Sequence, residues 1–514
     1  MNSARLDPFS ISSSLEWGGI HTTLREHCHG LVPLPARLAP WMQSLCSSPA
    51  LPEMVQEFGS PLNILCKQPF QRNINLLRET ARAFQLDFEI YFARKANKCL
   101  TFVEVASQLG CGIDTASTNE IRQSLDLGVP AEKIICTAAV KSQELLGLCI
   151  KAGITIAIDN TDELLLTEHQ AQEVQRPANI ALRISGFSYD GKKLNSRFGF
   201  DIAEIASLVQ QFWSRIDAGI RNLTITGLHF HLDGYSRHQR IAAIRQLLPF
   251  IDDLRSQQHP IEFLDMGGGL PMSYLDSKDA WDLFWREHRQ ALLVNRSPLT
   301  WENHGLGLIA DEGRLLGKPK CYPCYQSPVQ QHWLQDVLQA ECEDASIAEA
   351  LRRRKLQLRC EPGRSILDGC GMTIARVEFR KQRSDGSWFI GLSMNRTQCR
   401  TNSDEFLVDP LLIPVGKLNP IPQPASSMEG YLVGAYCNES EFLSLRRFHF
   451  PQGVFLGDLI VFPNTAGYFM HFLESRSHQF PLARNVFYDP ATEQIDLDLI
   501  DQERTLDAPR KPNQ

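Results

Sequence analysis

Between about residue 88 and residue 365 the chain alternates short apolar runs with longer amphipathic stretches, and this repetition constrains the fold more than any other feature. The runs are often about 20 to 25 residues apart, as repeated strand and helix units require. Eight are present: FEIYFARK, CGIDTAS, KIICTAA, ITIAID, NIALRIS, LTITGLHFHL, IEFLDMGGG and LQLRCEPGRS. Strands that are buried on both faces are apolar throughout, which is typical of a parallel sheet. We therefore predict an α/β protein with a (β/α)8 TIM barrel, and a doubly wound open sheet is the alternative.

The repetition is interrupted once and then ends, which predicts the domain organisation. More than 80 residues separate the seventh run from the eighth, so we predict a barrel over residues 61–365 with an insertion at about 272–355. Later strand-like runs such as MTIARVEFRK and GDLIVFP indicate a C-terminal β domain over residues 366–514. The first 60 residues are rich in proline and serine, and we expect an N-terminal extension that adds a strand to the β domain or lies over the barrel.

Composition excludes several classes of protein. The net charge of -7 argues against a nucleic-acid partner, which would require a basic face. The N-terminus has no apolar run typical of a secretory signal, and no stretch approaches the ~20 apolar residues of a membrane span. The 14 cysteines are scattered, and the lone CxxC at Cys321 and Cys324 is a weak zinc signal without a second pair. We expect a soluble cytoplasmic protein with free thiols, no metal and no membrane partner.

The predicted strands end in side chains that can react or bind a ligand, and in this fold the strand ends face the catalytic mouth. They are Lys95, Asp114, His229 and His231, Gly267 to Gly269, and Glu361 with Arg364, after the first, second, sixth, seventh and eighth strands. Alone, Lys95 is equally well explained as a solvated charge, His231 as a structural histidine and the glycines as a turn. Together they provide an amine for a Schiff base, a glycine loop and an arginine for a phosphate, and a carboxylate for a ring nitrogen. Pyridoxal 5'-phosphate requires this combination.

Seven segments in the same order resemble motifs of the pyridoxal-phosphate-dependent decarboxylases of the alanine-racemase-like (fold type III) class, such as diaminopimelate, ornithine and arginine decarboxylases. The resemblance extends from about residue 60 to about residue 470. The segments are YFARKAN, GCGIDTASTNEI, GLHFH, LDMGGGLP, CEPGRS, GAYCNESEFL and GDLIVFPNTAGYFMHF.

The resemblance implies a role for each site residue and a decarboxylation through a Schiff base and a quinonoid intermediate. Lys95 would form the Schiff base near Asp114, His231 would stack on the ring, and Glu361 would pair with the ring nitrogen. The phosphate would be held by Gly267, Gly268, Gly269, Arg364 and Tyr468. Cys437 would return the proton to Cα from the neighbouring subunit, which implies a homodimer with shared active sites. Glutamate rather than arginine at the ring nitrogen favours decarboxylation over racemisation.

The chain departs from the family where a substrate would be selected. The histidine motif continues as HLDGYS instead of Ile-Gly-Ser-Gln, which removes a serine expected at the phosphate and introduces Asp233 and Tyr235. Asn438 follows Cys437 where diaminopimelate decarboxylases usually have glutamate. The expected substrate-binding residues are Glu439, Glu441 and either Arg396 or Arg400. We predict an amino-acid decarboxylase similar to diaminopimelate decarboxylase with altered substrate residues; the alternatives are a racemase on the same barrel and an inactive binding protein.

Overall fold

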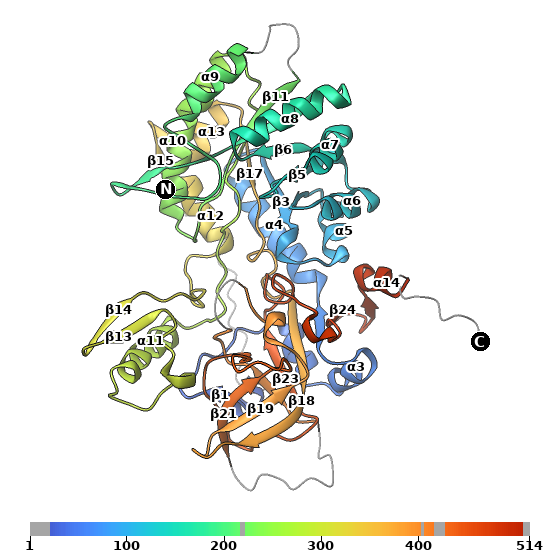
Figure 1. Cartoon of the computed structure of the whole chain (residues 1–514), viewed down its shortest axis with the longest axis vertical. Coiled ribbons are helices and arrows are strands. Elements are labelled where there is room, and N and C mark those ends of the chain that lie inside the picture. The colour runs from blue at the N-terminus through green and yellow to red at the C-terminus, as the bar shows by residue number, and fades with distance from the viewer. Residues whose placement is uncertain (1–20, 216–221, 402–405, 416–426, 507–514) are drawn as a thin grey trace, which may run out of the picture.

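The chain folds into a helix-wrapped parallel barrel and a second domain built on a mostly antiparallel sheet (Figure 1). The computed structural model describes residues 21–215, 222–401, 406–415 and 427–506. The predicted TIM barrel with a C-terminal β domain is confirmed, and the open-sheet alternative is wrong, because the sheet closes on itself.

Each of the eight apolar runs supplies one barrel strand. The strands are β3 (Phe88–Ala93), β4 (Gly112–Thr115), β5 (Ile134–Cys136), β6 (Thr155–Ile158), β7 (Ala178–Ser185), β11 (Leu223–Phe230), β12 (Phe263–Asp265) and β17 (Gln357–Cys360). Neighbouring strands pair in parallel, and the pairing of β6 with β7 closes the barrel. All the strand ends that carry the candidate residues therefore point to the same mouth.

Helices cover the outside of the barrel (Figure 1). They are α4 (Lys67–Ala83), α5 (Leu100–Gln108), α6 (Thr118–Asp126), α7 (Gln143–Ala152), α8 (Thr161–Val174), α9 (Ile205–Arg215), α10 (Arg237–Ser256), α12 (Gln330–Gln339) and α13 (Ile347–Arg353). Several begin at a side chain that accepts a hydrogen bond from the first turn, as Ser117 does for α6 and Ser236 for α10. Such caps satisfy backbone N–H groups that the helix itself leaves unpaired, so in these helices a capping side chain marks the first turn.

The sheet of the second domain draws strands from both ends of the chain. Its strands are β1 (His29–Gly30), β2 (Leu62–Leu65), β18 (Gly371–Gln382), β19 (Trp388–Leu392), β20 (Leu411–Ile413), β21 (Met428–Val433), β22 (Phe448–Phe450), β23 (Leu459–Pro463), β24 (Arg484–Tyr488) and β25 (Ile495–Leu497). β1 pairs with β22, and β2 lies between β18 and β24. The helices α1 (His21–Glu26), α2 (Pro40–Cys46), α3 (Ala50–Phe58) and α14 (Leu499–Leu506) complete the described ends of the chain.

The segment between β12 and β17 has two parts. The first contains α11 (Lys278–Leu292) and the hairpin of β13 (Leu308–Asp311) and β14 (Arg314–Gly317), and it lies beside the second domain (Figure 1). Phe284 and Trp285 of α11 share a buried cluster with Phe448 and Phe450 of β22. The second part, α12 and α13, returns to the barrel wall. Short pairs also occur at β8 (Ser188–Tyr189) with β9 (Lys192–Lys193) and at β15 (Glu341–Cys342) with β16 (Ala345–Ser346), while β10 (Phe200–Asp201) extends β7.

In the described ranges, no helix combines the length and apolar character that crossing a bilayer requires. All 14 cysteines are free, and all but Cys321 and Cys437 are buried.

Candidate active site

Lys95 lies directly after β3, in the single 3-10 turn Arg94–Ala96. Arg94 is buried and donates to the carbonyl of Glu120 in α6 at 2.8 Å. Of these two adjacent cations, Lys95 is the one that lies in the barrel mouth. Lys95 Nζ lies 2.7 Å from Asp114 Oδ2 at the end of β4. Burial lowers the pKa of Lys95, but Asp114 and Glu361 outweigh it and raise the pKa above its ordinary value. Asp114 thus stabilises the ammonium form of Lys95 and fixes the position of its Nζ.

Glu361 follows β17 and forms the floor of the site together with His229 of β11. His229 Nε2 lies 3.2 Å from Glu361 Oε1, and both side chains are almost fully buried. Burial, followed by the positive charge of Arg183, holds the pKa of His229 well below its usual range. Burial raises the pKa of Glu361, while Lys95 and Arg183 act against this rise. The histidine is therefore neutral, and the two cations favour the carboxylate form of Glu361.

Arg183 of β7 fixes which nitrogen of His229 carries the proton. Arg183 Nε donates to His229 Nδ1 at 3.1 Å, and Arg183 Nη1 donates to Asp159 Oδ1 at 3.0 Å. Arginine has no acceptor, so Nδ1 accepts and the proton of the neutral ring lies on Nε2, facing Glu361. His229, Asp265 and Glu361 form the one group of metal-type spacing among the described residues. A protonated Nε2 has no lone pair for a metal, so the geometry favours a positioning role for His229.

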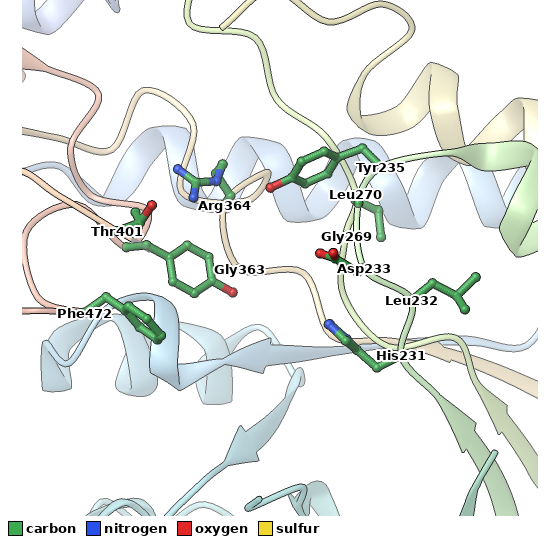
Figure 2. Close-up of a pocket in the computed structure, with 12 residues that line it drawn as sticks. His231, Leu232, Asp233, Tyr235, Gly269, Leu270, Gly363, Arg364, Thr401 and Phe472 are labelled. Atoms are coloured by element: carbon green, nitrogen blue, oxygen red, sulfur yellow. The ribbon is translucent and has the colours of Figure 1, made fainter. Parts of the chain in front are cut away.

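A cavity of about 190 Å³ opens beside this floor, between the barrel mouth and the second domain (Figure 2). Its walls are formed by His231, Leu232, Asp233, Gly234, Tyr235, Gly269, Leu270, Gly363, Arg364, Thr401, Tyr468 and Phe472. Figure 2 shows Arg364, Tyr235, Asp233 and His231 around the open space. Burial lowers the pKa of His231 to about 3, and Lys95 contributes to this shift, so His231 is a neutral ring at physiological pH.

Glycine is required at the edge of the cavity because the backbone is left-handed at some positions and leaves no room for a Cβ at others. Gly267 and Gly269 have φ of +64° and +82°, in the left-handed region. A Cβ on Gly363 would lie 2.9 Å from the Tyr468 hydroxyl and 2.7 Å from Ala96. Tyr468 itself has φ of +74° and its backbone N–H donates to the carbonyl of Ala96 at 2.8 Å. This bond ties the Lys95 turn to the second domain.

Arg240 of α10 supports the glycine loop and carried no signal in the sequence, where it is one of several arginines of a helix. It is completely buried, and its Nη2 donates to the carbonyls of Leu232, Gly234 and Gly268 at 3.1, 2.9 and 3.2 Å. One side chain thus holds the histidine loop and the glycine loop together. Thr401 and Phe472, also unpredicted, bring the second domain into the cavity wall.

The structure does not bring the predicted substrate residues to this cavity within one chain. Cys437 is exposed, as is Glu439, and neither belongs to the cavity wall. Glu441 is buried and its Oε1 accepts a hydrogen bond from the backbone N–H of Arg396 at 2.7 Å. Arg400 Nη2 donates to the carbonyl of Phe442 at 2.9 Å. The segment around Cys437 is therefore bonded to residues 396–400 rather than to the cavity.

The residues that the structure brings together fit pyridoxal phosphate. Glu361 Oε1 and Asp265 Oδ2 are buried carboxylate oxygens without an aligned hydrogen-bond donor among the described residues. A buried carboxylate oxygen in this state is costly unless a donor arrives, and a protonated ring nitrogen is such a donor. The amine of Lys95, the neutral ring of His231 and the cavity with Arg364 and its glycine edge complete the set of groups that this cofactor requires.

Comparison with known proteins gives consistent matches. Residues 72–317 match the pyridoxal-binding domain of the pyridoxal-dependent decarboxylases. An uncharacterized protein of Sinorhizobium fredii is 30% identical over 463 residues, which cover 89% of this chain and 94% of that protein. The diaminopimelate decarboxylase of Methanocaldococcus jannaschii is 26% identical over 288 residues, 52% of this chain and 65% of that enzyme. Its crystal structure in complex with L-lysine superposes with a TM-score of 0.63 at 18% identity, covering 87% of this chain and 91% of that one.

Proposed function

The chain belongs to the fold type III pyridoxal-phosphate-dependent decarboxylases, and from this premise we propose that it removes the α-carboxylate of an amino acid. The observation that carries the proposal is the pairing of Lys95 with Asp114 on one side of the barrel mouth and of His229 with Glu361 on its floor. The first pair provides an amine held in position by a carboxylate, and the second provides a buried carboxylate for a ring nitrogen. A racemase would gain less from this carboxylate, because an ionised partner at the ring nitrogen deepens the electron sink.

Each residue then has a definable task. The cofactor, when bound, supplies the electron sink for the bond broken at Cα. Asp114 would hold the Lys95 amine in position in the barrel mouth, and the neutral ring of His231 would pack against the cofactor ring without adding a charge. Arg183 and His229 keep Glu361 as a carboxylate turned toward the ring nitrogen. Gly267, Gly268, Gly269, Arg364 and Tyr468 bind the phosphate.

We further propose that the enzyme is a cytoplasmic homodimer whose partner subunit contributes Cys437. The exposure of Cys437 outside the cavity of its own chain supports this assignment, because a proton donor must reach Cα. Fourteen free thiols agree with a reducing compartment. Glu441 accepts from the backbone of Arg396 and Arg400 donates to the carbonyl of Phe442, whereas Glu439 is exposed, so Glu439 is the first candidate to contact a substrate and Arg400 and Glu441 follow it. The altered residues at these positions favour a substrate related to, but different from, diaminopimelate.

The test is a screen for carbon dioxide release by the purified protein with pyridoxal phosphate. The panel contains L- and D-amino acids, including ornithine, lysine and diaminopimelate. We expect stoichiometric carbon dioxide and amine from at least one member. Inversion at Cα without carbon dioxide release would identify a racemase instead. Failure of the protein to capture the cofactor at Lys95 would favour an inactive binding protein.

A further inference from the structure

The segment inserted after the glycine loop begins and ends at the same place, beside Arg364. We call residues 272–275 and 321–326, where its two ends meet, the stem. The backbone N–H groups of Tyr274 and Leu275 donate to the carbonyl of Cys324 at 2.7 and 3.2 Å. The Tyr322 hydroxyl donates to the carbonyl of Met272 at 2.8 Å and accepts from Gln326 Nε2 at 2.7 Å. The stem is therefore a closed, hydrogen-bonded unit.

Two tyrosines of the stem enclose the guanidinium of Arg364. The carbon Cζ of Arg364 lies 4.3 Å from the centre of the Tyr322 ring, which is nearer than the rings of Tyr468 and Phe469 at 5.0 and 5.3 Å. Tyr274 contributes its hydroxyl, which accepts from Arg364 Nη1 at 2.7 Å. Both stem tyrosines are buried. A cation over a desolvated aromatic face is attracted to it, so the Tyr322 ring holds the plane of the guanidinium.

This enclosure occupies one nitrogen of Arg364 and leaves the others available. Nη1 donates to Tyr274 and to the carbonyl of Gly467, whereas Nη2 and Nε have no acceptor among the described residues. Arg364 also forms part of the cavity wall with Gly269 and Gly363. Nε and Nη2 together carry three N–H groups in a fixed plane, and such a set is suited to bidentate binding of phosphate oxygens.

We propose that Tyr322, carried by the insertion, is a positioning residue that orients Arg364 for the phosphate group of the cofactor. The inference rests on the proposed function, because it concerns the same site. It also gives the insertion a local role, because its stem supports the side of the cavity that contains Arg364. Its other described elements, α11 and the β13–β14 hairpin, pack on the second domain and are not part of the cavity wall.

The experiment compares two probes that differ only in the phosphate. Pyridoxal phosphate and pyridoxal are titrated into the wild-type protein and into Tyr322→Leu, and the dissociation constants are measured from cofactor absorbance. We expect Tyr322→Leu to weaken pyridoxal phosphate about ten-fold and to leave pyridoxal unchanged. Tyr322→Phe keeps the ring and should restore binding to within about two-fold of wild type. Tyr325→Leu, in the same loop but without a contact to Arg364, is the matched control and should bind both probes as wild type does.

The outcomes separate the inference from the proposed function. Equal weakening of both probes in Tyr322→Leu would mean that Tyr322 only supports the fold, and no weakening of either would mean that Arg364 needs no such wall; each result overturns the inference. If the leucine variant does not fold, Tyr322→Met replaces it, because methionine fills an irregular space without an aromatic face. A wild-type protein that captures neither probe at Lys95 contradicts the proposed function itself.

Discussion

The floor of the barrel and the segment around Cys437 are built in opposite ways. On the floor and beside it, ionisable groups are paired inside one chain: the half-buried Lys95 with the buried Asp114, and the buried Glu361 with the neutral ring of His229. Around Cys437 the charged groups are either exposed, as Glu439 is, or bonded to residues 396–400, as Glu441 is to the backbone of Arg396. This difference shows that one chain gathers the groups we assign to the cofactor, whereas Cys437 and the residues we assign to the substrate lie outside its cavity.

Replacing Lys95 should abolish covalent capture of the cofactor. Lys95→Ala leaves no amine for covalent capture, so we expect the visible absorbance of the bound cofactor to disappear. Carbon dioxide release should fall by on the order of 10³-fold or more. Lys98→Ala is the matched control, since Lys98 lies three residues away but forms an ion pair with Glu474. Persistence of the band and of activity in Lys95→Ala would place the covalent site elsewhere.

Replacing Cys437 should slow catalysis without affecting cofactor binding. Cys437→Ala should lower the rate of carbon dioxide release by about 10²- to 10³-fold, because proton return to Cα loses its positioned acid. The cofactor absorbance should remain, since Cys437 lies outside the cavity of its own chain.

Mixed dimers distinguish a shared site from a self-contained one. After Lys95→Ala and Cys437→Ala chains are mixed and allowed to exchange, half of the dimers contain one of each, and each mixed dimer has one intact site. Activity should then return to about a quarter of the wild-type value for a two-fold symmetric dimer. Mixtures that exchange subunits and stay inactive would show that Cys437 acts within its own chain, whereas full activity of Cys437→Ala by itself would show that Cys437 does not act at all.

Replacing Arg183 should have a smaller effect, and it tests whether Arg183, His229 and Glu361 act together on the floor of the site. Arg183→Met removes the donor that holds the proton of His229 on Nε2, together with a cation that favours ionised Glu361. We expect kcat to fall about ten-fold, equal to ~1.4 kcal/mol, with a shift of the acid limb of the pH profile to higher pH. The limb moves up because Glu361 loses a charge that opposes its protonation. Arg176→Met, at an exposed position before β7, should change neither kcat nor the profile.

The sequence was sufficient for the barrel because a strand buried on both faces must be apolar along its whole length, and eight such runs are present. Parallel closure then placed Lys95, Asp114, Glu361 and Arg364 at one mouth, although their roles came from the resemblance to a family. Arg183 could not be assigned this way. It interrupts an apolar strand as a single charge, and no local pattern tells that it meets His229, which is 46 residues later.

Features in segments without a periodic pattern also could not be predicted from the sequence. β1 has only two residues, His29 and Gly30, too few to show alternation, and its partner β22 is more than 400 residues away. Tyr322 lies in an irregular loop whose lone CxxC invited a metal interpretation. Its ring contact with Arg364 depends on the closing of the stem, which sequence spacing does not reveal.

The smallest expected effect concerns the charge state of the cavity wall. Burial holds the pKa of His231 at about 3, whereas the unfolded chain titrates near its ordinary value of about 6.5. Between these values the unfolded state binds more protons, so the stability present above pH 6.5 is lost as the pH falls. Removing this titration in His231→Phe should make the cofactor-free protein lose about 1 kcal/mol less than wild type between pH 7 and pH 5, as measured by urea unfolding. His238→Phe, at an exposed position on α10, should behave as wild type. Equal losses in wild type and His231→Phe would mean that His231 is no more buried than a surface histidine. The wall of the cofactor cavity would then be as open to solvent as the segment around Cys437.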